Sequence, residues 1–497
     1  MTPLIAPDAM REMERRFFAE TGVRSIDLME TAARALCGVL LSRYGADKSV
    51  GFACGPGGNG GDGYACARMY RKAGGRAFVV SAKPPTSLDA AENLRRAKEA
   101  GVGEGLDDRP DIWVDALYGT GLSRAPSGAA AALIDRMNAD YESGSVVVAV
   151  DIPSGLNGAT GRAYAPCIRA DLTVTFQYAK PGCCLNDGLD VSGEVVPVDI
   201  GIPASYYPDD SPALVDETEV RAALPPRPRN FHKGDAGHLL IVAGSFGMAG
   251  AAALCARSAM ACGAGLVTVA CPRSIVPILQ TLAPCAMCVP LPEADGAIAD
   301  DAAPVLEAIL PGKAAVVCGC GLSRRASPKV IGLLMTCGLP ALFDADALNL
   351  ISEDDGLRAL FGERHIITPH PGEAARLLGR RIDDPIADAR ALRALGCQAL
   401  LKGAATVVPV GGRALISTSG CAGMAKGGSG DCLSGILGAL MAQAGKGATG
   451  DKLASLAAAG SELHGVAGEL ACAQKGIRGM TPLDLIDALP RALMAYE

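Results

Sequence analysis

Short apolar runs alternate with amphipathic helical patterns from about residue 50 to residue 176. The apolar runs are VGFAC, RAFVVSA, DIWVDALYG, SVVVAVDIP and LTVTF, and the helical segments between them are 63–73, 88–100 and 127–138. Apolar runs of this length suit strands that are buried on both faces, and helices are the usual crossovers between parallel strands. The pattern therefore predicts an α/β fold with a doubly wound, Rossmann-like sheet.

The alternation stops between residues 204 and 237, where proline is dense in YYPDDSP and LPPRPRN. It restarts at residue 238 with strand-like runs such as HLLIVAG, LVTVACP, AAVVCGCG, HIITPHPGE and QALLKGAATVVPV. We therefore expect two domains, residues 1–217 and 218–497, of which the second is another, larger α/β domain. Both halves show this alternation of strands and helices, but they contain no obvious sequence repeat, so each should have its own ligand site.

Composition narrows the class of protein. Hydrophobic residues make up 49% of the 497 residues and charged residues 20%, which is enough apolar material for two buried sheets. The formal net charge of −7 offers no basic surface to nucleic acid, and aromatics at 4% provide few stacking platforms. No apolar run reaches the roughly 18 residues of a membrane span. We therefore expect a cytoplasmic small-molecule enzyme without nucleic-acid or membrane partners.

Eighteen cysteines are a high count, yet they stand singly within helix-like and strand-like runs or as the neighbours Cys183 and Cys184. In a large cytosolic chain, most such cysteines are small buried hydrophobic residues. The CGC run at 318–320 and the CAMC run at 285–288 lack a second matching pair. The cysteine pattern therefore does not predict a zinc site.

The run CGPGGNGGDGYACARMY follows a strand and opens a helix. Glycine-rich turns at that position let backbone N–H groups meet an anion, although the spacing is not that of a dinucleotide fingerprint. Three polar side chains follow further strands that should end on the same edge: Asp115, Asp151 and Ser154. Oxygen atoms of Asn59, Asp115 and Ser154 suit a hard cation, and Asp151 is a candidate proton acceptor. The alternative is that these residues only cap the turns after their strands.

Three motifs carry a resemblance to a known family: GPGGNGGDG, VDALYGTGLS and VAVDIPSGLNGATG. They resemble the NAD(P)H-hydrate epimerase family over about residues 1–210. The resemblance implies a K⁺ ion beside the substrate, facing Asn59, Asp115 and Ser154, and places Asp151 at the reacting nicotinamide ring. The family usually has a second asparagine where this chain has Gly58. The implied substrate-binding residues are Gly58, Asn59, Gly60, Gly61, Asp62, Gly119, Thr120, Gly121, Leu122, Ser123, Arg124, Ala125 and Asp151.

In the second half, AKGGSGDCLSG at 425–435 places one acid, Asp431, among glycines directly before an apolar helical run. N–H groups at such a helix start can hold a phosphate under transfer, and Asp431 can accept the proton of the attacking hydroxyl. The alternative is an ordinary acid in the first turn of a helix, favoured there by the helix dipole. KGAAT at 402–406 offers a lysine and backbone N–H groups to nucleotide phosphates, and TPHPGE places His370 after a strand.

These motifs, together with HKGDAGHLLIVAGS, GAGLVTVACP and DADALNLI, resemble the ADP-dependent NAD(P)H-hydrate dehydratase family over about residues 230–490. The resemblance implies a ribokinase-like fold and Mg²⁺ bound with ADP. The implied nucleotide-binding residues are Lys402, Gly403, Ala404, Ala405, Thr406 and Gly430. The implied substrate-binding residues are Ala251, Gly321, His370 and Asp431, of which Asp431 is catalytic. The chain departs from the usual family pattern at Cys320, Ala405, Cys421 and Ala422.

A chain with both halves resembles the bifunctional NAD(P)H-hydrate repair enzymes. The resemblance implies that the first domain epimerises the R and S hydrates of NADH and NADPH (NADHX and NADPHX). The second domain would dehydrate the S hydrate with ADP, giving NAD(P)H, AMP and phosphate, and we expect a homo-oligomer. From the residues alone, another function stays open: a ribokinase-like small-molecule kinase with a non-catalytic nucleotide-binding or scaffold module at its N-terminus.

Overall fold

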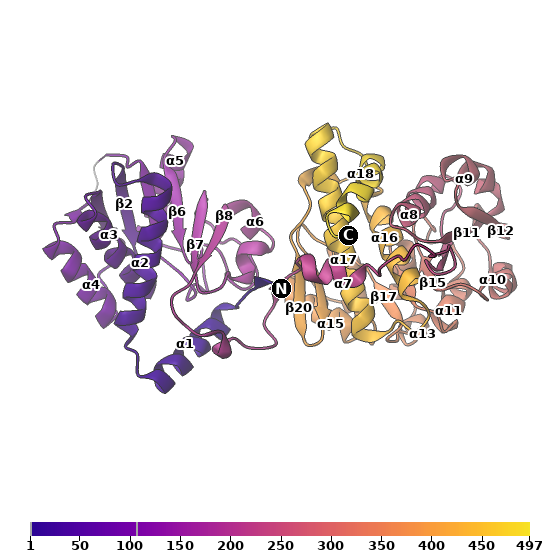
Figure 1. Ribbon diagram of the computed structural model, residues 1–497, viewed down its shortest axis with the longest axis horizontal. Coiled ribbons are helices and arrows are strands. Elements are labelled where there is room, and N and C mark those ends of the chain that lie inside the picture. Colours follow the sequence, from indigo (N-terminus) through magenta and orange to yellow (C-terminus); the bar gives the residue numbers. More distant parts are fainter. Residues whose placement is uncertain (1, 106–107) are drawn as a thin grey trace. The chain divides into compact units, whose positions relative to one another are not determined.

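The computed structural model describes residues 2–105 and 108–497. It divides into two compact units, an N-terminal unit, Pro3–Pro212, and a C-terminal unit that contains Ala213–Glu497 (Figure 1). The expected boundary after residue 217 falls at the first residue of α7 (Glu217–Ala223). The residues just before α7 already belong to the C-terminal unit, because β9 (Ala213–Leu214) pairs with β20 (Arg413–Ser417).

The N-terminal unit is built on a seven-stranded parallel sheet in the order β4-β3-β2-β5-β6-β7-β8. The strands are β2 (Ser49–Cys54), β3 (Arg76–Ser81), β4 (Gly103–Glu104), β5 (Ile112–Ala116), β6 (Val146–Val150), β7 (Leu172–Phe176) and β8 (Glu194–Val198). The order reverses between β2 and β5, which is where open α/β sheets bind their ligands. The pattern missed the edge strands because β4 is very short and β8 is partly exposed.

Helices cover both faces of this sheet, which confirms the doubly wound fold (Figure 1). One face packs against α1 (Pro7–Thr21), α2 (Ser25–Tyr44), α3 (Gly58–Lys72) and α4 (Leu88–Glu99), and the other against α5 (Ala129–Glu142). Helix α3 begins at Gly58 and not at residue 63 as expected, so the glycine run forms its first turns. A Cβ on Gly60 would lie 1.9 Å from the carbonyl oxygen of Gly55, a contact that only glycine allows.

The C-terminal unit contains a second seven-stranded parallel sheet, in the order β12-β11-β10-β15-β16-β17-β18. Its strands are β10 (His238–Val242), β11 (Leu266–Pro272), β12 (Met287–Leu291), β15 (Ala315–Cys318), β16 (Ala341–Phe343), β17 (His365–Ile367) and β18 (Gln398–Ala399). The run QALLKGAATVVPV is divided between β18 and β19 (Thr406–Val410). Strand β19 pairs with β20 in a separate small sheet, so the KGAAT turn connects two sheets.

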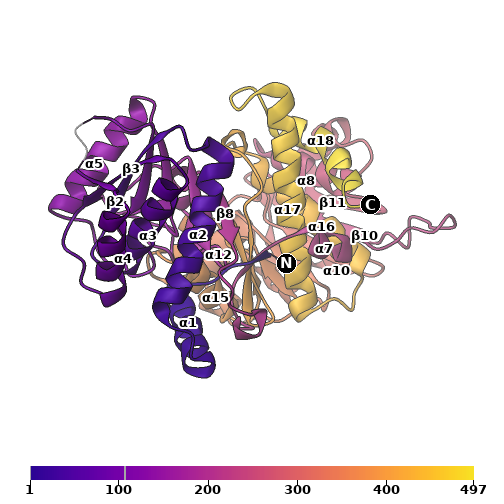
Figure 2. The same ribbon diagram turned by 60° about the vertical axis from the view of Figure 1, so that its left-hand side comes forward.

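Long apolar helices pack around the large sheet of this unit. Helix α16 (Ser429–Ala444) lies against α8 (Ala249–Ala261) and α17 (Gly450–Lys475), and α18 (Pro482–Met494) packs on α17 (Figure 2). The remaining longer helices are α9 (Val276–Leu282), α10 (Ala303–Ile309), α11 (Pro328–Thr336), α12 (Asp346–Glu353), α14 (Pro371–Leu378) and α15 (Pro385–Arg393). These helices hold the carboxyl ends of the strands in fixed positions, where the polar residues gather.

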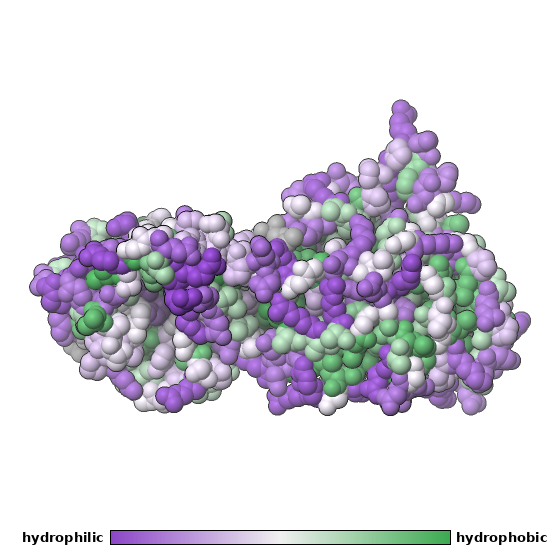
Figure 3. All heavy atoms as spheres, turned by 90° about the horizontal axis from the view of Figure 1, so that it is seen from below, coloured by the Kyte–Doolittle hydropathy of each residue, from purple (hydrophilic) through white to green (hydrophobic). Residues whose placement is uncertain are grey.

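Most cysteines are buried and free, as expected, but six differ: Cys167, Cys288 and Cys337 are only partly buried, and the other three depart further. Cys421 and Cys472 form a disulfide, and Cys285 is exposed. No local pattern indicates the disulfide, because its two cysteines are 51 residues apart and meet only through the packing of α17. The surface in Figure 3 is largely hydrophilic, with a hydrophobic area on the C-terminal unit. No helix within the described residues is long and apolar enough to cross a membrane.

Two candidate active sites

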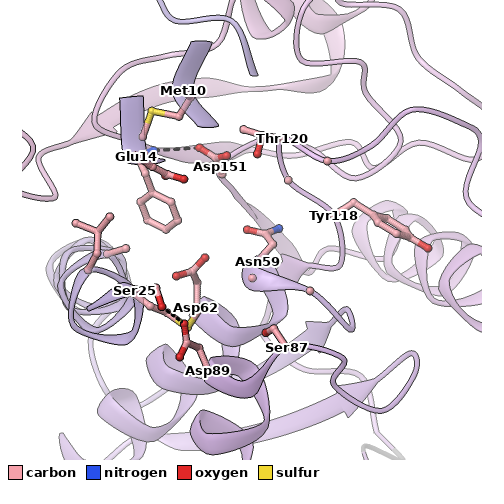
Figure 4. A pocket seen from close by; sticks show the side chains of 18 of the residues that line it. Met10, Glu14, Ser25, Asn59, Asp62, Ser87, Asp89, Tyr118, Thr120 and Asp151 are labelled. Atoms are coloured by element: carbon pink, nitrogen blue, oxygen red, sulfur yellow. Dashed lines mark hydrogen bonds between the residues drawn. The ribbon is translucent and has the colours of Figure 1, made fainter. Parts of the chain in front are cut away.

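A cavity of about 560 Å³ opens in the N-terminal unit at the carboxyl ends of β2 and β5 (Figure 4). The first turn of α3 and the GTGL turn after β5 form part of its wall, and α1 and α2 contribute further side chains. The expected substrate residues that line it are Gly58, Asn59, Asp62, Gly119, Thr120, Gly121, Leu122 and Asp151. The other expected substrate residues are not among its described lining residues: Gly60, Gly61, Ser123, Arg124 and Ala125. The cavity lies at the sheet reversal, where the fold predicts a ligand.

Asp151 is held in the cavity wall by a dense set of contacts. It follows β6 with a left-handed φ of 69°, and its Oδ1 atom accepts hydrogen bonds from Thr175 Oγ1 and the Phe176 N–H, both at 3.2 Å. The Lys180 ammonium forms an ion pair with the same oxygen, and this lysine is completely buried. These three donors all converge on one carboxylate oxygen and fix its orientation. Asp151 is therefore an anchored base whose second oxygen remains on the cavity side, near Gly119.

Two more carboxyl groups face this cavity, those of Glu14 on α1 and Asp62 on α3 (Figure 4). Burial and then the charge of Asp151 raise the pKa of Glu14 to about 7. Burial, followed by the charges of Asp151 and Glu14, raises the pKa of Asp62 well above its usual range. The surroundings of Asp62 therefore favour its protonated form, and Glu14 is poised between its two states near neutral pH.

The sequence reasoning missed Glu14 and Lys180. Lys180 did carry a signal, because it stands in AKPG just after the strand LTVTF, where a ligand edge was expected. Glu14 had no such signal, since the run MREMERRF is typical of a charged, solvent-facing helix. Only the packing of α1 against the sheet turns this one acid inward.

The glycine loop and the GTGL turn meet at Asn59 and Gly119. A Cβ on Gly119 would lie 3.3 Å from Asn59 Cγ and 3.5 Å from Asp151 Oδ2, so the absent side chain keeps this corner open. The Asn59 side-chain nitrogen is buried and has no hydrogen-bond partner within the described part of the chain. A buried amide without a partner is available to a ligand in the cavity.

The expected cation ligands are only partly brought together. Ser154 donates to Asp115 from its backbone N–H at 2.7 Å and from its hydroxyl at 2.6 Å, while Asn59 lies in the cavity wall. Burial, opposed by these hydrogen bonds, raises the pKa of Asp115 to about 6. Asp115 has no cationic partner among the residues the structure describes. A buried carboxylate with hydroxyl and amide oxygens nearby in the fold fits a hard monovalent cation. In the described ranges, no three His, Cys, Asp or Glu side chains form a ready metal cluster.

In the C-terminal unit, the GGSGD run forms the start of α16, as expected. Gly428 is the N-cap residue with a φ of 104°, and Asp431 lies in the first turn. Burial raises the pKa of Asp431 to about 6, while a hydrogen bond from the Cys320 thiol opposes the rise. Asp431 can therefore exchange a proton near neutral pH, next to N–H groups that attract an anion.

Lys402 and Gly430, both expected at the nucleotide, lie close together. A Cβ on Gly430 would lie 3.6 Å from the Lys402 ammonium. That ammonium donates to Asp344 Oδ1 at 2.7 Å, and Ser434 on α16 donates to Asp344 Oδ2 at 2.8 Å. Burial lowers the pKa of Lys402, but the charges of Asp344 and Glu373 outweigh this and raise it. The lysine is therefore charged and positioned beside the anion-binding helix end.

The other residues expected at this site lie on several different elements of the C-terminal unit. Gly321 has a φ of 59°, and a Cβ there would lie 2.8 Å from the Cβ of Ala251, so these two residues are neighbours. His370 is the N-cap of α14, where its Nδ1 atom accepts hydrogen bonds from the N–H groups of Gly372 and Glu373. Of the rest of KGAAT, Gly403 and Ala404 are exposed, Thr406 opens β19, and Ala405 is buried. Sequence reasoning missed Ser434, which lies on the apolar face of α16.

Comparison of the sequence with known proteins assigns a different family model to each of the two units. Residues 239–491 match the family model described as NAD(P)H-hydrate dehydratase, and residues 25–182 match the model described as the YjeF-related protein N-terminus. The bifunctional NAD(P)H-hydrate repair enzyme of Moorella thermoacetica is 37% identical over 526 residues, covering 99% of this chain and 97% of that protein. The corresponding enzyme of Escherichia coli is 35% identical, covering 97% of this chain and 92% of that protein.

A solved ribokinase-like protein from Enterococcus faecalis matches with a TM-score of 0.50 and 23% identity, covering 58% of this chain and 98% of that one. This likeness confirms the ribokinase-like fold of the C-terminal unit. The full-length identity to the Moorella protein, together with the two family models, decides the family. The chain belongs to the bifunctional NAD(P)H-hydrate repair enzymes.

Proposed function

We propose that this enzyme returns hydrated NADH and NADPH to their normal forms in two steps. The N-terminal domain, residues 1–217, interconverts the R and S hydrates, and the C-terminal domain, residues 218–497, dehydrates the S hydrate with ADP. The products are NAD(P)H, AMP and phosphate. The observation that carries this proposal is the full-length similarity to bifunctional repair enzymes, combined with a separate anchored carboxylate in each unit, Asp151 and Asp431.

The dehydration follows from the start of α16. Asp431 accepts the proton of the hydroxyl on the hydrated ring, and that oxygen attacks the β-phosphorus of ADP, so that AMP leaves. Loss of a proton from the neighbouring ring carbon then expels phosphate and restores the double bond. Lys402 and the Gly430 backbone would hold the nucleotide phosphates, while Ala251, Gly321 and His370 would contact the hydrated ring.

The residues around Lys402 also fit the Mg²⁺ that accompanies a nucleoside diphosphate. Asp344 and Glu373 supply carboxylate oxygens close enough to Lys402 to raise its pKa. Mg²⁺ commonly binds through one or two carboxylates together with substrate phosphates. Bound there, the ion would offset phosphate charge, while Lys402 orients the diphosphate and Asp431 handles the proton.

In the N-terminal domain, Asp151 would accept the proton of the ring hydroxyl, and Asn59 and Asp62 would hold the carboxamide. Asp62 suits this task because burial and the charges of Asp151 and Glu14 raise its pKa and so favour the protonated form, which can donate a hydrogen bond. We infer that K⁺ binds near Asp115 and Ser154, with Asn59 on the cavity side, and supplies positive charge close to the substrate. Asp115 is the supporting observation, because it is a buried carboxylate that has no cationic partner in the described ranges.

One experiment tests both activities. The protein is incubated with a mixture of R and S NADH hydrate and ADP, and nicotinamide absorbance and released phosphate are followed. Full recovery of NADH supports both activities, and rapid recovery of only one epimer shows an inactive epimerase domain. A phosphorylated product that retains its phosphate, without NADH, overturns the proposal in favour of a ribokinase-like kinase. Parallel runs with ATP establish the nucleotide preference.

Two further expectations accompany this function. We place the enzyme in the cytoplasm because its substrates arise from soluble NADH and NADPH. We also propose a homo-oligomer, supported by large exposed apolar side chains that lie close together in the sequence on α9 and β12: Ile278, Leu282 and Met287. Light scattering of the purified enzyme measures the oligomeric state, and a monomeric mass contradicts this proposal.

A further inference from the structure

Glu14 has an unusual position for an acid on a charged helix. The other acids on α1 make ion pairs with arginines of the same helix, for example Glu12 with Arg15 and Glu20 with Arg16. Glu14 points into the N-terminal cavity, and within residues 2–105 and 108–497 no hydrogen bond or ion pair of its carboxyl is present (Figure 4). An inward carboxyl without a partner costs stability, so its position indicates a task in the site.

The carboxyl groups of Glu14 and Asp151 lie on the same side of this cavity, and Asp62 lies across from them (Figure 4). Each belongs to a different element, since Glu14 comes from α1 and Asp151 follows β6. The fold has therefore placed two carboxyls side by side at one wall. Two adjacent proton-transfer groups can serve two nearby atoms of a substrate.

We propose that Glu14 is the general acid of the epimerisation and works beside Asp151, the general base. This inference rests on the proposed epimerase function of the same cavity. The hydrated ring has two atoms that need a proton transfer, the hydroxyl oxygen and the ring nitrogen N1, and both are bonded to C6. Asp151 would face the hydroxyl, and Glu14 would face N1.

The reaction balances without any other reactant. Asp151 takes the hydroxyl proton, the oxygen forms a carbonyl with C6, the C6–N1 bond breaks, and N1 takes its electron pair and a proton from Glu14. Rotation about the C5–C6 bond turns the other face of the aldehyde toward N1. Nitrogen then attacks C6 and returns its proton to Glu14, while the carbonyl oxygen recovers its proton from Asp151. Both side chains end in their starting states.

The charged groups around the pair support this division of roles. Lys180 and two further donors anchor the Asp151 carboxylate. Glu14 lies near Asp151 and Lys180 on the same side of the cavity and near Arg11 on its own helix. The carboxyl of Asp62, from α3, lies opposite. Burial and Asp151 raise the pKa of Glu14 to about 7, and Lys180 and Arg11 oppose that rise. The two carboxyls thus differ in their surroundings, because an ammonium and two further donors hold Asp151, whereas Glu14 has no such partner in the described part of the chain.

The test uses the full chain with a mixture of both NADH hydrates and ADP. The S hydrate is consumed in a fast phase, and the R hydrate follows in a slow phase set by epimerisation. Glu14→Gln is expected to slow the second phase by about 10²–10⁴-fold with little change in KM, while the fast phase stays at the wild-type rate. Glu12→Gln, on the exposed side of the same helix, is the matched control and should leave both phases unchanged.

Two further measurements separate a catalytic role from a structural one. In the wild type, the slow-phase kcat should fall as pH rises above about 7, because Glu14 loses the proton it must donate, and this fall should disappear in Glu14→Gln. Glu14→Asp, which keeps the carboxyl, should restore part of the rate. In water enriched in ¹⁸O, the product epimer should form without obligatory uptake of one solvent oxygen per turnover.

The outcomes separate this inference from the proposed function. A slow phase of Glu14→Gln equal to that of the wild type overturns the role of Glu14. Uptake of one solvent oxygen per turnover overturns the ring-opening path. A wild-type slow phase no faster than spontaneous epimerisation contradicts the epimerase function itself, whatever the variants do.

Discussion

Lys180 and Asp151 form a buried ion pair at the wall of the N-terminal cavity, and the lysine has no solvent-exposed surface. The lysine ammonium also donates to the Phe176 carbonyl at 3.0 Å and to Thr175 Oγ1 at 3.1 Å, so all three of its protons are engaged. A buried pair of this kind is stable only while both partners are present. Its presence at the cavity wall fixes the orientation of the Asp151 carboxylate.

The first prediction concerns this pair. Lys180→Met should lower the free energy of unfolding of the N-terminal unit by about 3–5 kcal/mol, because it leaves an unpaired buried carboxylate. Epimerisation should be lost at the same time. The double variant Lys180→Met with Asp151→Asn should recover most of the stability but none of the activity. Denaturant unfolding of the three proteins measures this, and equal stability of the single and double variants would contradict it.

The second prediction concerns Asp431. Asp431→Asn should lower dehydratase kcat by about 10²–10⁴-fold, because the attacking hydroxyl loses its proton acceptor, and should leave epimerisation intact. In the wild type, kcat/KM for dehydration should fall as pH drops through about 6, since burial raises the pKa of Asp431 to that value and only the ionised form accepts a proton. Stopped assays of phosphate release between pH 5 and pH 8 check both points. An unchanged rate in Asp431→Asn would remove this residue from its assigned role.

Much of both sites could be predicted because glycine-rich runs and strand-end acids are local features of the sequence. Asp151 and Asp431 were identified from their neighbours along the chain alone. Lys180 and Glu14 join the site only because the segment after β7 and helix α1 pack against the sheet, which is a long-range effect. Helix α3 was placed too late because glycine is a weak helix former, and close packing against Gly55 outweighs that propensity.

The third prediction tests this packing with two helical glycines of the N-terminal unit. Gly60→Ala should destabilise the unit strongly, because the new Cβ would meet the backbone of Gly55, which a side-chain rotation cannot relieve. Gly38→Ala, on the exposed face of α2, should stabilise the unit by about 0.5–1 kcal/mol, since nothing lies within 4 Å of its Cβ. Chemical denaturation gives both values. A destabilised Gly38→Ala would show an unrecognised contact on α2.

The last prediction concerns the disulfide between Cys421 and Cys472, which ties the residues just before the GGSGD run to α17. A Cβ on Gly423 would lie 2.5 Å from Cys472 Sγ, so this segment packs directly on the bridge. Reduction should lower the free energy of unfolding of the C-terminal unit by about 2–4 kcal/mol and raise the dehydratase KM, because the segment leading to the phosphate-binding helix loses its tether.

Cys472→Ser should reproduce these effects and no longer respond to reductant. Cys285→Ser, which changes an exposed free cysteine, should behave like the wild type in both states and is the matched control. Peptide mapping of protein prepared without reductant should yield a linked peptide that contains both residues. If that peptide is absent, the two sulfurs are thiols in solution, and any effect of reductant on dehydration must come from another cysteine. Because the N-terminal cavity lies in a separate unit, epimerisation should be indifferent to reductant, so the ratio of the two activities reports the state of the bridge.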